Sequence, residues 1–176
     1  MQEHRAPDPI ADPQGYQRYL LELLGEDDPA EVQERTPAAW WSLLDAAGPG
    51  VRARPDGSEW SALECFAHSV DAEVVMSARY RWILAQDQPP LIGYDQDLWA
   101  DRLHRPVEPV EELTATFAAL RAANVALWRR TPQELRARVG MHAERGPESY
   151  DLSFRMIAGH DRFHLAQARR ALDAAG

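Results

Sequence analysis

Apolar side chains recur every three or four positions along most of this chain, which is the spacing of one face of an α-helix. Alternating runs of β-branched and aromatic residues, the pattern of a half-buried strand, are nearly absent. Each predicted helix has one apolar face to bury, so the sequence predicts an all-α four-helix bundle. We expect a single domain over residues 1–176, with a core at about 12–174 and long helices at about 12–24, 58–88, 110–130 and 149–174.

Helix start and stop signals divide the chain further. Ser58 is the expected N-cap of the second long helix. A shorter helix is predicted to start at Thr36–Pro37 and to end before the Gly48–Pro49–Gly50 segment. Residues 89–109 are too broken for a long helix, and 97–103 suit only a turn or two. We therefore expect a long crossover between the second and third long helices.

Three of the six histidines lie where an inward-facing cluster is expected. His160 and His164 are four residues apart in the last helix, so they project from one face with Cβ atoms about 6 Å apart. His68 lies in the apolar stripe of the second long helix. Its depth along that helix matches the depth of the pair whether the two helices run parallel or antiparallel. All three imidazoles are predicted to meet inside the bundle.

Inward imidazoles need polar partners, because an unpaired buried nitrogen costs on the order of 1–3 kcal/mol. A divalent cation satisfies three nitrogens at once, and three protein ligands leave positions open to water or substrate. Imidazole ligation suits zinc or nickel, and also iron or manganese. The alternative is a surface pair or a hydrogen-bonded core pair of histidines that binds no metal.

Two segments resemble the signatures of the DinB-like family, which includes the mycothiol- and bacillithiol-dependent transferases. They are WSALECFAH at 60–68, continuing to Glu73 and Arg79, and HDRFHLAQ at 160–167. The resemblance covers about residues 16–172. It implies a four-helix bundle with a long crossover, a homodimer, and a divalent metal site carried by His68, His160 and His164. An insertion at about 40–54, which lengthens the connection between the first two long helices, departs from the family pattern.

Several residues near the histidines are weaker candidates. Glu64 and Asp71 lie about one helical turn on either side of His68, where each could orient an imidazole or a metal-bound water. The competing interpretation makes both of them solvent-exposed helix carboxylates. Gln167 follows His164 by three residues and is a candidate hydrogen-bond partner near the site.

Four further residues are assigned structural roles by the sequence alone. Cys65 is predicted to be a small buried hydrophobe rather than a nucleophile. Asp161 falls off the histidine stripe and is predicted to be solvated. His142 is expected on an exposed loop, with a position at the mouth of the pocket as the alternative. Arg79 is expected to pair with a helix-end carboxylate, the alternative being an acidic substrate.

Composition limits the partners. The net charge of −9 repels nucleic acid and anionic membranes, and no stretch is apolar enough to span a membrane. A single cysteine excludes an internal disulfide, and no secretory signal is visible, so a cytoplasmic location is expected.

Two classes of function remain. The first is a metal-dependent enzyme acting on a small molecule, for which the family resemblance suggests either S-transfer from a low-molecular-weight thiol or metal-assisted hydrolysis. The second is a non-catalytic, stress-associated metal-binding bundle. Sealing of the open metal positions by side chains such as Trp60 or Phe163 would favour the second class.

Overall fold

The computed structural model describes residues 6–9, 11–56, 59–104 and 109–175. Six helices follow one another, with three short helical turns and three short strands between them. The elements are α1 (Pro13–Leu24), α2 (Pro29–Ala47), η1 (Gly48–Arg52), α3 (Ala62–Ala85), β1 (Pro90–Leu91), α4 (Gln96–Trp99), η2 (Ala100–His104), α5 (Val110–Arg130), η3 (Gln133–Ala137), β2 (Val139–His142), β3 (Gly146–Ser149) and α6 (Tyr150–Ala175).

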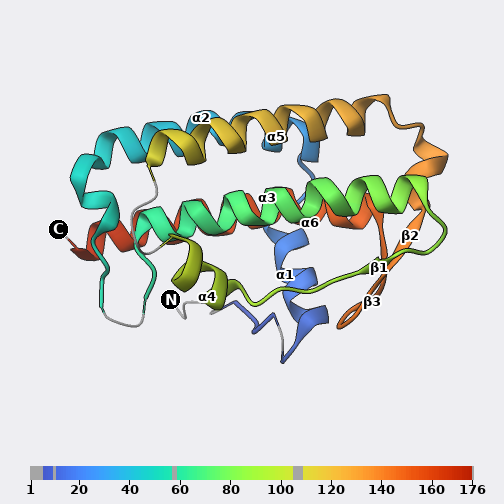
Figure 1. Ribbon diagram of the computed structural model, residues 1–176, viewed down its shortest axis with the longest axis horizontal. Helices are drawn as coiled ribbons and strands as arrows, with labels where there is room; N and C mark the ends of the chain where they lie inside the picture. The colour runs from blue at the N-terminus through green and yellow to red at the C-terminus, as the bar shows by residue number, and fades with distance from the viewer. Residues whose placement is uncertain (1–5, 10, 57–58, 105–108, 176) are drawn as a thin grey trace.

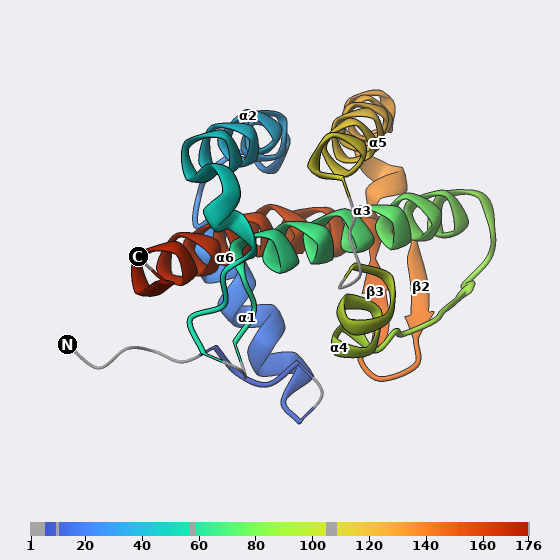
Figure 2. The ribbon, with the colours of Figure 1, turned by 60° about the vertical axis from the view of Figure 1, so that its left-hand side comes forward.

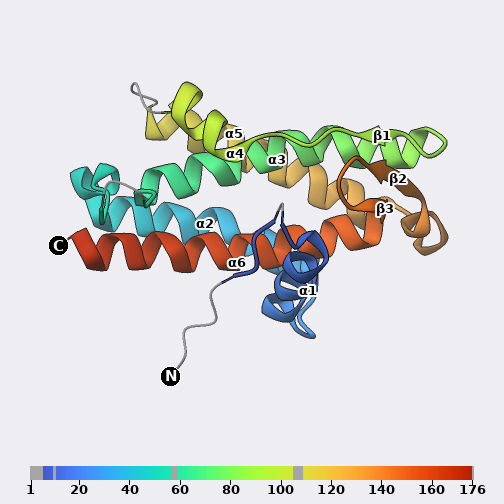
Figure 3. The same cartoon turned by 90° about the horizontal axis from the view of Figure 1, so that it is seen from below.

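The four-helix bundle is confirmed, and it consists of α2, α3, α5 and α6 (Figure 1). Figure 2 shows it as two layers, with α2 and α5 over α3 and α6. The helices α3 and α6 run in opposite directions, which decides the orientation that the sequence left open. Helix α1 lies outside the bundle and crosses α6 (Figure 3).

The helix that completes the bundle is α2, and the prediction that residues 12–24 form one of its four long helices is wrong. The predicted short helix from Thr36–Pro37 is also wrong at its start, because α2 begins at Pro29 and continues through Pro37. Asp28 caps the new start by accepting hydrogen bonds from two backbone N–H groups. An internal proline costs about 3 kcal/mol, but burial of side chains such as Trp40 contributes about 1.5–3 kcal/mol each. Residues 40–47, predicted to be part of an insertion, therefore belong to helix α2 of the bundle. Within 40–54, only 48–54 connect one bundle helix to the next, as an insertion would.

Helix α3 begins later than the sequence suggested. Its N-cap is Ser61, which forms a reciprocal capping box with Glu64. Ser58, the predicted N-cap, lies outside the described residues. The predicted bounds of α5 agree with the structure, because a proline precedes that helix and Thr131–Pro132 follows it.

A small sheet was not predicted. Strand β1 pairs in parallel with β2, and β2 pairs antiparallel with β3. Strands of two to four residues are too short for an alternating pattern to emerge from sequence. Glycine suits position 140, where β2 passes Leu91 of β1, because a Cβ there would lie 2.8 Å from Leu91 Cγ. The sheet ties the crossover to β2 beside α3.

The core forms two apolar clusters along the bundle, one around Trp40, Phe66 and Phe117 and the other around Tyr80, Trp128 and Phe154. Gly159 lets α1 approach α6 closely, because a Cβ at that position would lie 1.9 Å from the carbonyl oxygen of Leu20. The crossing of α1 is therefore fixed next to His160. In the described part of the chain, every helix is too short or too polar to cross a membrane.

Candidate metal centre

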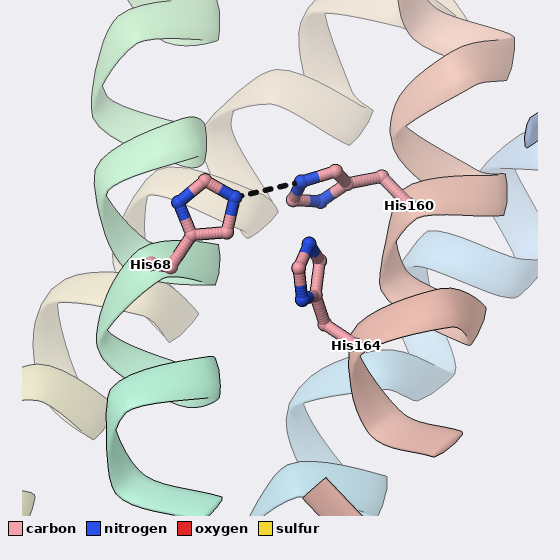
Figure 4. A group of neighbouring side chains, drawn as sticks. All are labelled: His68, His160 and His164. Carbon is pink, nitrogen blue, oxygen red and sulfur yellow. Dashed lines mark hydrogen bonds between the residues drawn. The ribbon is translucent and has the colours of Figure 1, made fainter. Parts of the chain in front are cut away.

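The three predicted histidines converge between α3 and α6. One ring nitrogen from each of His68, His160 and His164 lies within 4.8 Å of the others. The Nε2 atoms of His68 and His160 are 3.1 Å apart. Figure 4 shows His68 facing His160 across the two helices, with His164 one turn along α6 and one of its nitrogens turned toward them. The rings are buried, with exposed fractions of 3%, 8% and 3%.

All three imidazoles are neutral at physiological pH. Burial lowers the pKa of each well below the usual value for histidine, and a neighbouring imidazole of the cluster lowers it further in each case. Neutral imidazole keeps a lone pair on one nitrogen, which is the form that binds a metal ion.

Gln167 sets the tautomer of His164. The Nδ1 atom of His164 lies 2.8 Å from Gln167 Oε1, so Nδ1–H donates to the amide oxygen and the lone pair stays on Nε2. That Nε2 atom is buried and has no hydrogen-bond partner among the described residues. An unpaired acceptor beside two other imidazole nitrogens fits a divalent cation, which the donor set of three neutral nitrogens also suits.

Aromatic rings enclose the cluster on one side. The Trp60 ring centroid lies 5.1 Å from that of His68 and 6.2 Å from that of His164, and Phe163 packs edge-on against His164 at 4.8 Å. These rings do not seal the site, because His68 and His160 line a cavity of about 400 Å³. The cluster is therefore accessible to a small molecule.

The cavity runs between α3, α6, the crossover and α1. Its inner wall is formed by small and apolar side chains such as Ala72, Met76 and Ile157, and its far end by Arg79 and His142. A second recess, of about 630 Å³, lies between α2 and the end of α6, but Arg169 is the one ionisable residue among its described lining. The ionisable side chains that could act on a ligand therefore line the smaller cavity.

The carboxylates on either side of His68 are buried, so the interpretation that made them exposed is wrong. Burial alone raises the pKa of Glu64, but hydrogen bonds from Arg54 and Ser61 bring it below its usual value. Asp71 Oδ2 lies 2.7 Å from His104 Nε2. Their predicted role in orienting the site stays a prediction.

Three structural assignments from the sequence are corrected. Asp161 is 1% exposed rather than solvated, because it faces Arg121 inside the bundle. His142 is buried in β2 and lines the cavity. Arg79 donates to the carbonyl oxygen of Ile92 instead of to a carboxylate. For His142 the alternative, a position at the pocket, agrees with the structure, whereas the exposed loop does not, because the short strand that carries it has no signal in the sequence.

Cys65 is completely buried, and burial raises the pKa of its thiol to about 12. A thiol in this state carries almost no thiolate at neutral pH, so it is no nucleophile. The prediction of a small buried hydrophobe is confirmed.

The fold and the cluster together define a helical bundle with a tri-histidine site open to a cavity. The chain belongs to the DinB superfamily, whose family model matches residues 14–168. This confirms the resemblance seen in the two histidine segments.

Among solved structures, the chain is similar to YfiT from Bacillus subtilis, described as a probable metal-dependent hydrolase with an unusual four-helix bundle topology. The TM-score is 0.74 at 15% sequence identity, and the match covers 96% of this chain and 91% of that one. At this identity the likeness establishes the fold. No curated protein sequence matches this chain.

Proposed function

We propose that this protein is a metal-dependent enzyme in which His68, His160 and His164 hold one divalent cation. The observation that carries the proposal is the buried Nε2 of His164, which has no hydrogen-bond partner among the described residues and lies in a cluster whose other two histidines line a cavity. Zinc or nickel suits three neutral imidazoles best, with iron or manganese as alternatives.

A cation at this position supplies a Lewis acid that lowers the pKa of a water or thiol entering the cavity. The chain itself contributes position and shielding. Gln167 keeps the His164 lone pair on Nε2, while the rings of Trp60 and Phe163 pack against His164. The cavity admits the small-molecule substrate from the other side.

We favour hydrolysis over thiol transfer as the reaction. The likeness to YfiT, described as a probable hydrolase, supports this choice. An S-transfer would need a low-molecular-weight thiol as cosubstrate. The non-catalytic alternative is disfavoured by the open cavity. A cytoplasmic location and a homodimer stay predictions.

The test begins with metal content. Chelated protein is reloaded separately with zinc, nickel, iron or manganese, and metal is measured after gel filtration. Wild-type protein and the His4→Ala variant should each retain about one ion per chain, whereas His160→Ala should retain almost none. Equal retention in wild type and His160→Ala contradicts the proposed site.

The reaction class is then decided by assay. The loaded proteins are offered a panel of esters and amides, and separately a panel of electrophiles with added thiol. We expect hydrolysis that requires both metal and His160. Metal-dependent consumption of thiol without hydrolysis would reverse our choice, and inactivity of fully loaded protein in both panels would favour the non-catalytic class.

A further inference from the structure

The cavity that begins at the histidines has a second polar end. Arg79 follows His68 on α3 after about three helical turns, so the two residues share a face about 16 Å apart along the axis. Long helical side chains lean toward the helix N-terminus, which directs Arg79 toward the histidine end. Between the two ends, α3 and α6 contribute the apolar side chains of Ala72, Met76 and Ile157, together with Ser153, while most of the polar lining comes from the crossover, α1 and the β2–β3 segment. The space suits an elongated molecule.

Arg79 is a buried cation without a carboxylate partner among the described residues, and its exposed fraction is 5%. One Nη donates to the carbonyl oxygen of Ile92, and the other lies 3.7 Å from the sulfur of Met76. Its Nε is buried and has no hydrogen-bond partner in the part of the chain that the structure describes. A buried charge left in this state is costly, because desolvation is not offset by an opposite charge. The missing partner is an anion.

His142 reaches the same place from β2. Its Nδ1 accepts the backbone N–H of Glu144 at 3.2 Å. A neutral imidazole accepts at one nitrogen only, so the hydrogen is on Nε2. That Nε2 lies 3.3 Å from an Nη of Arg79, which also carries hydrogens. Two donors therefore face each other, an arrangement that an oxygen accepting from both would satisfy.

Among the described residues, no nearby carboxylate supplies such an oxygen. Glu148 is fully buried, but it is engaged by Arg145 at 2.6 Å and by the hydroxyl of Ser153 at 2.7 Å. The remaining acidic side chains of the cavity lining are exposed. They are Asp8, Asp95, Asp97 and Glu144. Acidic groups at the mouth repel a dianion more strongly than a monoanion, so a single carboxylate fits this end better than a phosphate.

We propose that Arg79 and His142 form a carboxylate-binding subsite, which selects substrates that carry a carboxylate at one end, an apolar middle and the reacting group at the histidine end. This inference rests on the proposed function for the histidine end only. Binding of the carboxylate needs no metal, so the two ideas can fail separately.

The first experiment uses the full chain after chelation of metals. Isothermal titration calorimetry measures the binding of octanoate and of the uncharged octanamide. Wild-type protein should bind octanoate about 10- to 100-fold more tightly than octanamide, the range of a charge-assisted hydrogen-bonded contact. The Arg79→Gln variant should lose this preference, and Arg79→Lys should keep part of it because the charge remains without the planar fork.

Arg81→Gln is the matched control. Arg81 lies two residues along the same helix, is exposed, and contacts Ser77 and Asn124 instead of lining the cavity. It should bind like wild type. Circular dichroism and thermal melting of each variant separate a lost ligand contact from a lost fold. A purely structural role for Arg79, anchoring the crossover, predicts two results. The Arg79 variants would melt at a lower temperature than wild type, and wild type would bind octanoate no more tightly than octanamide. That pair of results overturns the proposal. Tighter binding of octyl phosphate than of octanoate would also overturn it.

A second experiment tests whether one ligand can occupy both ends of the cavity. Zinc-loaded protein is titrated with octanohydroxamate and with the hydroxamate of equal length that ends in a carboxylate. The carboxylated probe should bind about 10- to 100-fold more tightly in wild type and equally in Arg79→Gln. Equal binding of both probes to wild type overturns the shared cavity. If neither hydroxamate binds while octanoate still binds with a dependence on Arg79, the metal site is overturned and the carboxylate-binding subsite is supported.

Discussion

Two buried polar clusters lie side by side on α6, and they differ in whether their polar groups have charged partners within the protein. Asp161 belongs to one and His160, its neighbour in the chain, to the other. Arg121 contacts Asp161 at 2.9 Å and Glu73 at 2.9 Å, while Asn124 donates to Glu73 at 2.7 Å. The first cluster also leaves Arg121 Nε without a hydrogen-bond partner among the described residues, but its opposite charges are paired. Among the described residues, the histidine cluster has no charged partner, and His68 Nδ1 and His164 Nε2 have no hydrogen-bond partner.

The difference indicates a structural role for the first cluster and supports the metal site proposed for the second. Burial raises the pKa of Glu73 although Arg121 opposes it, and Asp161 and Glu73 raise the pKa of Arg121 against the effect of burial. These charges stabilise each other within the bundle. Two of the imidazoles, those of His68 and His160, instead line a cavity, and the proposed partner of the cluster is a metal ion from outside the chain. The predictions that follow test this contrast.

The largest effect is expected from loss of an imidazole. His164→Ala removes the nitrogen that has no internal partner, so metal affinity should fall by orders of magnitude while the metal-free protein stays helical. Competition with a chromophoric chelator measures the affinity, and circular dichroism measures the helicity. Unchanged affinity would place the ion elsewhere.

Disrupting the other cluster should affect stability instead. Arg121→Met leaves Glu73 and Asp161 buried without a cation, and should lower the free energy of unfolding by about 3–5 kcal/mol. Arg129→Met on the same helix breaks an exposed pair with Glu34 and should cost about 0–1 kcal/mol. Denaturant titration compares the two. Similar losses would show that the buried cluster has no special role.

A smaller effect is expected at the hydrogen bond that orients His164. Gln167→Ala frees Nδ1 and should weaken metal binding about 10- to 100-fold. Gln167→Glu keeps an acceptor and should retain most of the affinity. The same chelator competition measures both variants, and equal affinity in Gln167→Ala and wild type would remove the tautomer argument.

The smallest effect concerns pH. The folded-state pKa of each clustered histidine lies well below its unfolded value of about 6.5, so the unfolded chain binds more protons as pH falls. The metal-free protein should therefore lose stability below pH 6.5, by up to about 1.4 kcal/mol per pH unit for each imidazole. Denaturant titrations at pH 7.5, 6.5 and 5.5 should give a shallower slope for His68→Ala than for wild type. Equal slopes would contradict neutral burial.

Much of the candidate site could be predicted from sequence. Spacing within one helix is fixed by 3.6 residues per turn. The sequence therefore predicts that His160 and His164 share a helix face and that His68 lies on an inward stripe. The bounds of α5 followed from prolines and a periodic apolar face. These features depend on neighbours a few residues away.

Tertiary structure decided the rest. Sequence alone left the directions of α3 and α6 open, started α2 at Thr36–Pro37 instead of at Pro29, and placed Asp161 in solvent. Whether a polar residue is buried depends on the partner opposite it, and Arg121 is distant in sequence from Asp161. The same holds for Arg79 and His142, which meet only because a strand too short to predict pairs with the crossover. Local periodicity fixes the face on which a side chain lies, whereas long-range packing fixes what that face meets.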